Sequence, residues 1–83
     1  MPSDKINVLE CLSKAQHFQR IATKCIVFID YYPFECKVNV TLVSDKGEIA
    51  VYKFNINNYF MENKQELQRL EEKFYKLNGI KDD

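Results

Sequence analysis

The chain has 83 residues with twelve basic and twelve acidic side chains, so its formal net charge is zero. A hydrophobic fraction of 46% is too high for a disordered chain, and we expect residues 1–83 to form a single domain with a frayed tail at 79–83. The neutral charge argues against nucleic-acid binding and against nucleic-acid mimicry, which favour basic and acidic chains respectively.

The first predicted element is a helix over residues 4–24. Ser3 is a suitable N-cap, and Asp4 would face the positive end of the helix dipole. Apolar residues recur at spacings of three and four and form one stripe: Val8, Cys11, Leu12, Ala15, Phe18 and Ala22. The other side is polar, which is typical of a helix that covers a core with one face.

Three strands are expected next. The first is predicted over residues 25–31, where β-branched and aromatic residues are abundant, and Pro33 interrupts it. The second is predicted over residues 36–43. In this strand and in the third, up to residue 56, apolar positions alternate with mostly polar ones, a period of two that indicates strands covered on one face.

The loop between the second and third strands sets their register. A three-residue loop at 45–47, with Gly47 at positive φ, pairs Ser44 with Glu48. The pairs on one face are then all apolar: Leu42 with Ala50, Val40 with Tyr52, Val38 with Phe54, and Cys36 with Ile56. A two-residue loop would place Val40 opposite Lys53, because a slip of one residue exchanges the faces. The sequence therefore favours the longer loop.

A second helix is predicted to begin after Asn58 or after Asn63, since Asn63 and Glu66 resemble a capping box. Its apolar stripe consists of Leu67, Leu70, Phe74 and Leu77. Gly79 is expected to end it in the left-handed conformation. The predicted fold is α+β, in the order α-β-β-β-α: a three-stranded antiparallel meander with two helices packed on one face.

No arrangement of residues predicts catalysis. The single histidine, His17, lies on the polar side of the first helix, whereas Cys11 lies in the apolar stripe, so no nucleophile has an activating base. Cys11, Cys25 and Cys36 are widely spaced, and we interpret them as buried thiols of a cytoplasmic protein. We expect no enzyme activity, no metal, no cofactor and no membrane span.

The element order is that of the double-stranded RNA-binding domain, and this topological resemblance covers the whole chain. In that family a lysine-rich start of the second helix grips phosphates. The matching positions 62–66 hold one lysine and two acids, so no motif supports the resemblance. An alternative nucleic-acid site is the basic side of the first helix, which a solvated surface explains equally well: Lys14, His17, Arg20 and Lys24.

The outer face of the predicted sheet is not polar throughout. The register gives it a polar end, with Asp30 near Lys37, and an apolar end that would form a partner-binding patch: Ile26, Phe28, Val43, Ile49 and Val51. Three alternatives would remove the patch. The start of the first helix or the C-terminal tail would cover it, or the first strand would face the other way.

The segment 31–34 contains a second set of candidate contacts. Tyr31 and Tyr32, held by Pro33, are suitable interface anchors, because aromatic side chains give a large area at low entropy cost. Alternatively, two of the three aromatic residues close the open end of the core. We expect this second role for Phe34 rather than for Tyr32.

These observations favour a small non-catalytic protein-binding module whose partner is a host protein or a second copy of itself. Lys, Ile, Asn, Phe and Tyr have AT-rich codons and are abundant here, which is typical of low-GC bacteria and their phages and plasmids. In size and style the chain is similar to phage inhibitors of host defence, including anti-CRISPR proteins. The alternatives are a nucleic-acid-binding domain that uses the first helix and a homo-oligomeric assembly factor.

Overall fold

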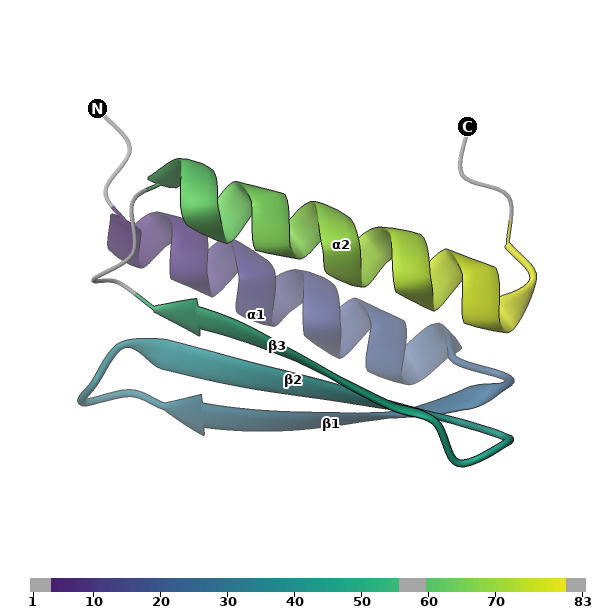
Figure 1. Ribbon diagram of the computed structural model, residues 1–83. Helices are drawn as coiled ribbons and strands as arrows, with labels where there is room; N and C mark the ends of the chain where they lie inside the picture. Colours follow the sequence, from purple (N-terminus) through teal and green to yellow (C-terminus); the bar gives the residue numbers. More distant parts are fainter. Residues whose placement is uncertain (1–3, 56–59, 81–83) are drawn as a thin grey trace.

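The computed structural model describes residues 4–55 and 60–80. Its elements follow the predicted order: α1 (Asp4–Ile21), β1 (Cys25–Tyr32), β2 (Lys37–Ser44), β3 (Ile49–Asn55) and α2 (Phe60–Asn78). The strands form one antiparallel sheet in the order β1-β2-β3. Figure 1 shows the two helices side by side on the same face of this sheet, which confirms the predicted α+β architecture.

The predicted register of the β2–β3 hairpin is confirmed. Leu42 lies opposite Ala50, and Val40 lies opposite Tyr52. The Ser44 N–H donates to the Glu48 carbonyl at 2.9 Å, and Gly47 has a φ of 85°. The hydroxyl of Ser44 also accepts hydrogen bonds from the N–H groups of Lys46 at 3.2 Å and Glu48 at 3.0 Å, which closes the loop.

Two boundaries of the sheet differ from the prediction. β1 continues to Tyr32, and β2 begins only at Lys37. Cys36, predicted to begin the second strand, lies in the preceding turn with a φ of 49°, and its N–H reaches the Pro33 carbonyl at 3.4 Å. A residue in the left-handed region cannot continue an extended strand. The predicted pair of Cys36 with Ile56 lies outside the described residues.

Helix α1 ends at Ile21, three residues earlier than predicted, and Asn78 of α2 gives the reason. The side-chain oxygen of Asn78 accepts hydrogen bonds from the N–H groups of Thr23 and Lys24, at 2.9 Å each. Its amide group donates to the Phe74 carbonyl at 2.8 Å. Because Asn78 satisfies the two N–H groups, the chain leaves the helix and enters β1.

Helix α2 begins at Phe60, so the predicted cap at Asn63 is wrong. Asn63 lies within α2 and is completely buried. Its side chain accepts a hydrogen bond from the Asn55 N–H at 3.2 Å and donates one to the Asn55 carbonyl at 2.9 Å. The predicted caps Ser3 and Asn58 lie outside the described residues. The predicted stop is confirmed: Gly79 has a φ of 67°, and the Ile80 N–H donates to the Tyr75 carbonyl at 2.9 Å.

The core lies between the helices and the inner face of the sheet. The rings of Phe18 in α1 and Phe74 in α2 stack with their centroids 4.0 Å apart and an interplanar angle of 9°. The remaining buried hydrophobic residues come from all five elements: Val8, Cys11, Ala15, Val27, Val38, Val40, Leu42, Phe54 and Leu70. The apolar stripes of both helices are therefore directed at one side of the sheet.

Candidate functional site

The outer face of the sheet carries the exposed apolar side chains that the sequence predicted. The exposed fractions are 57% for Ile26, 50% for Phe28, 68% for Ile49 and 50% for Val51, whereas Val43 is half-buried. β1 does not face the other way, because Val27 is buried beneath the helices. Helix α1 lies on the inner side, and within residues 4–55 and 60–80 no element covers the outer face. The predicted alternative of a covering tail at 81–83 lies outside the described residues.

The outer face consists of four cross-strand rows, each with one residue from every strand. The two rows beside the 45–47 loop form the apolar end, namely Ile26–Val43–Ile49 and Phe28–Thr41–Val51. The two rows at the opposite end of the strands form the polar end, namely Asp30–Asn39–Lys53 and Tyr32–Lys37–Asn55. Neighbouring rows on one face are in contact distance, so the apolar side chains form one continuous patch.

The polar end is organised around Lys37. Its ammonium group forms an ion pair with Glu35 at 2.8 Å and lies 4.7 Å from the centre of the Tyr32 ring. The hydrogen bond and the negative charge of Glu35 raise the pKa of Lys37 above its ordinary value. Asp30 lies opposite Asn39 rather than opposite Lys37, so the charge partner of Lys37 comes from the turn before β2.

The aromatic residues of segment 31–34 are all exposed. Tyr31 and Tyr32 have exposed fractions of 42% and 41%, and Phe34 is fully exposed. The prediction that Phe34 closes the core is therefore wrong. Phe34 occupies the tight turn between β1 and β2, where the chain reverses beyond the end of the helix-covered sheet and no described element packs on it.

The basic residues of the alternative nucleic-acid site do not share one helix. Lys14, His17 and Arg20 lie on α1, but Lys24 lies in the turn that follows the helix. The ammonium group of Lys14 lies 5.7 Å from the centre of the Phe18 ring, which keeps it half-buried. Three of the four predicted residues therefore lie on α1, and the fourth follows it directly.

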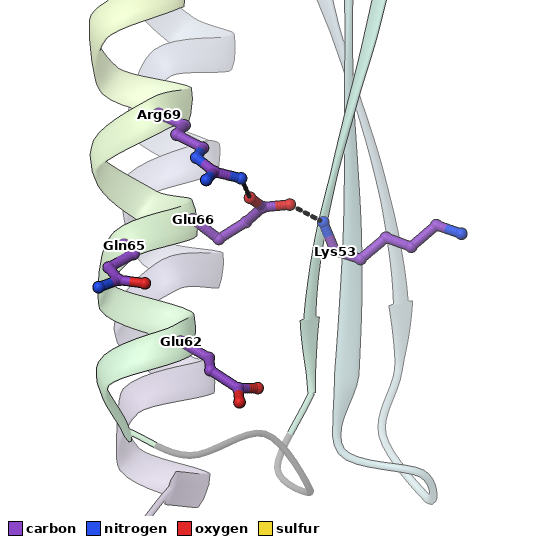
Figure 2. A pocket seen from close by; sticks show the side chains of 5 residues that line it. All are labelled: Lys53, Glu62, Gln65, Glu66 and Arg69. Carbon is purple, nitrogen blue, oxygen red and sulfur yellow. Dashed lines mark hydrogen bonds and ion pairs between the residues drawn. The ribbon is translucent and has the colours of Figure 1, made fainter.

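A polar hollow of about 240 Å³ lies between α2 and β3 (Figure 2), and no pattern in the sequence predicted it. The Glu66 carboxylate accepts from the backbone N–H of Lys53 at 3.2 Å and lies 3.6 Å from the Arg69 guanidinium. Figure 2 also shows the Lys53 side chain extending to the side of the sheet away from α2. The Glu66 carboxylate at the centre of the hollow therefore already has two partners, one of which is a backbone N–H group at the edge of β3.

The three cysteines have different environments. Cys11 is fully buried, and its burial together with the charges of Glu10 and Glu71 raises the pKa of the thiol to about 12. Cys25 and Cys36 are only half-buried, so the prediction of three buried thiols is correct for Cys11 alone. Cys25 begins β1 and its sulfur accepts a hydrogen bond from the Asn78 side chain at 3.3 Å, whereas Cys36 lies in the turn before β2.

Residues 4–55 and 60–80 contain neither a metal centre nor a membrane span. The described histidine, cysteine, aspartate and glutamate side chains form no group of three that would hold a metal ion. Neither described helix is long and apolar enough to cross a membrane.

Comparisons with known proteins do not assign the chain to a family. No protein-family model matches it, and neither the curated proteins nor the solved structures include a significant match.

Proposed function

We propose that this chain is a small non-catalytic protein-binding module and that the apolar end of its outer sheet face is the binding surface. The observation that carries the proposal is the exposure of Ile26, Phe28, Ile49 and Val51 in two adjacent cross-strand rows. Single exposed apolar residues are ordinary, but a continuous patch of this kind on a small domain is typical of an interaction site.

The surroundings of the patch support this proposal. A polar end with Asp30, Lys37 and Lys53 adjoins it on the same face. Interfaces commonly combine an apolar centre with a charged rim that fixes orientation. Tyr32 and Phe34 lie at the far end of the face and extend the area that a partner would contact.

For the partner we propose a protein of the host of a phage or plasmid, which the module would modulate or inhibit in the manner of anti-defence proteins, including anti-CRISPR proteins. The abundance of residues with AT-rich codons supports such an origin. The zero net charge supports contact with a protein surface rather than nucleic-acid mimicry.

The test is a comparison of immobilised variants exposed to a host lysate. Phe28→Asp and Val51→Asp place a charge in the patch, and Gln16→Asp places the same charge on the exposed side of α1 as a matched control. We expect the wild type and the control to retain one and the same protein, identified by mass spectrometry, and the two patch variants to lose it. Retention by the patch variants would contradict the proposal.

The second candidate function is nucleic-acid binding by α1. The salt dependence of binding distinguishes it from protein binding by the outer face. Phosphate contacts weaken steeply as salt rises, whereas an apolar interface does not. Under this alternative a duplex RNA probe binds the wild type at low salt, and Lys14→Glu with Arg20→Glu abolishes the binding. We expect this double variant to leave protein binding unchanged, because both residues lie on the helix side of the molecule.

A further inference from the structure

We propose that, when no partner protein is bound, the outer face packs against the same face of a second copy of this chain about a two-fold axis parallel to β2. This inference rests on the proposed role of the outer face and adds a second occupant, which a partner protein would displace. A two-fold axis makes the same patch serve both copies, so the patch must be complementary to itself. Of the two axes that keep the strands of both copies aligned, the order of residues within the four cross-strand rows meets this condition for one only.

The axis parallel to β2 reverses each row and places it on itself. β2 then lies over β2 of the second copy, and β1 lies over β3. In the apolar end this places Ile26 against Ile49 of the second copy and Phe28 against Val51 of the second copy, each pair occurring twice. Sheets that stack in this way keep their strands within about 30° of each other and lie about 10 Å apart.

The same operation brings opposite charges together in the polar end. Asp30 and Lys53 occupy the two ends of one row, so reversal places Asp30 against Lys53 of the second copy, again twice. The Lys53 side chain points to the outer side of the sheet, as this pairing requires (Figure 2). The remaining row places Lys37 near its own counterpart, and Glu35 at 2.8 Å neutralises that charge within each copy.

The other face-to-face two-fold axis, perpendicular to the strands, gives a poor match. It would place the apolar end of one copy on the polar end of the other, with Phe28 against Asp30 and Val51 against Lys53 of the second copy. Charged groups buried against apolar side chains without partners are costly. The arrangement of residues therefore selects the axis parallel to β2.

Side-chain contacts at the sheet edges favour stacking of faces over addition of strands. At the edge of β3, Glu66 binds the Lys53 N–H, and Asn63 binds the N–H and the carbonyl of Asn55. At the edge of β1, Gln19 of α1 donates to the Val27 carbonyl at 2.9 Å. A strand that joined either edge would compete with these hydrogen bonds.

The area of the face sets the expected affinity. Strands about 4.8 Å apart, and up to eight residues long at about 3.3 Å each, give a projected face of about 380 Å². Two such faces together give about 760 Å² of projected area, below the roughly 1,200 Å² of accessible surface that the smallest stable interfaces bury in total. We therefore expect a weak dimer that forms reversibly at high protein concentration.

The first measurement is sedimentation velocity of the purified chain over a dilution series. We expect the wild type to pass from the mass of one chain to that of two as its concentration rises, with only a small dependence on salt. Phe28→Asp should remain a monomer throughout the series, while Gln16→Asp on α1 should dimerise like the wild type. A wild type that stays monomeric at the highest concentration overturns the inference.

A charge exchange tests the axis itself. Asp30→Lys alone brings two lysines together at each of these pairs, and Lys53→Asp alone brings two acids together. We expect each variant alone to dimerise about tenfold more weakly, because two attractive pairs become repulsive. An equimolar mixture of the two should regain the wild-type affinity, since each charge pair of the mixed dimer then joins one lysine to one aspartate if the axis is correct.

In the mixed dimer, both charge pairs join groups of opposite charge. In the mixed dimer, position 30 of the Asp30→Lys copy meets Lys53→Asp of the other copy, whose carboxylate pairs with the new ammonium group. The second pair joins the native Asp30 of one copy to the native Lys53 of the other, so both pairs are opposite in charge. A mixture that is no tighter than the separate variants overturns the proposed axis.

The failure of this inference is distinguishable from failure of the proposed function. A monomeric wild type whose host partner is lost on Phe28→Asp leaves the outer face as a binding surface with a foreign occupant, and overturns the inference alone. A dimer that Phe28→Asp leaves intact shows instead that self-association uses another surface, and also overturns the inference.

Discussion

The two faces of the same sheet both carry apolar side chains, but these side chains differ strongly in burial. On the inner face Val38, Val40 and Leu42 have no exposed surface, whereas on the outer face Ile26 and Ile49 are more than half exposed. The difference is due to the helices, because α1 and α2 each have one apolar stripe and both stripes pack on the inner face. Within residues 4–55 and 60–80, the chain thus covers one side of its sheet and leaves the other exposed.

Among substitutions that only remove a side chain, the largest expected effect comes from comparing one phenylalanine on each face. Phe54→Ala removes a fully buried ring and should lower the free energy of unfolding by about 3–5 kcal/mol. Phe28→Ala removes a half-exposed ring and should cost less than about 1 kcal/mol in a dilute sample. Urea denaturation followed by circular dichroism measures both. Equal losses would mean that the outer face is covered in solution.

A smaller effect is expected where a polar side chain holds α2 against the α1–β1 turn. Asn78→Ala removes the acceptor for the N–H groups of Thr23 and Lys24 and should cost about 2 kcal/mol, because these groups lose their partner. Gln68→Ala, which removes an exposed amide from the same helix, is the control and should change little. If Asn78→Ala were as stable as the control, the inner face would not depend on this contact.

The buried thiol on the inner face predicts a dependence of stability on alkaline pH. The pKa of Cys11 is raised from 9.0 to about 12 in the folded chain, so the unfolded chain loses this proton first. The free energy of unfolding should therefore fall as the pH rises from 9.0 towards 12, by at most about 1.4 kcal/mol per pH unit.

The control for this effect is Cys11→Ala, which retains every other group that titrates in this range. The contribution of Cys11 is the difference between the slopes of the two proteins, measured by urea denaturation at several pH values. Parallel slopes would contradict the assignment of a buried thiol. About two pH units below 9.0 and lower, we expect almost no contribution, because the thiol is then protonated in both states.

The smallest expected effect on stability is that of a charge on the outer face. Phe28→Asp should change the free energy of unfolding by about 1 kcal/mol or less at concentrations where the chain is monomeric, since the new carboxylate remains in water. Val40→Asp on the inner face should prevent folding, because its carboxylate would be buried among apolar side chains. Thermal melts of the two variants compare the faces directly. Unfolding by Phe28→Asp would show that the faces are wrongly assigned.

Much of the fold followed from local patterns in the sequence. The period of two in the hairpin, together with Gly47, was sufficient for the register, because a slip of one residue would bury Lys53. The apolar stripe that includes Phe18 and the stripe that includes Phe74 predicted which sides of the helices meet the sheet. The exposed positions of the outer face followed from the same alternation, so the candidate site could be predicted without any tertiary contact.

Other features depended on contacts between distant parts of the chain. Helix α1 ends early because Asn78, more than fifty residues later, binds the N–H groups that would have continued it. Asn63 has the sequence signature of a cap but lies within α2, where its side chain bonds to the backbone of Asn55. Propensity describes a residue and its neighbours, and it contains no information about such partners.

The sequence by itself therefore determined the element order, the hairpin register and the two faces of the sheet, since each depends on residue spacing alone. The tertiary structure decided where α1 and α2 begin or end, which charge accompanies Lys37, and that Phe34 is exposed. It also showed that, among the described residues, no element covers the outer face. Spacing determines which side chains share a surface, whereas burial depends on what the rest of the chain can bring against that surface.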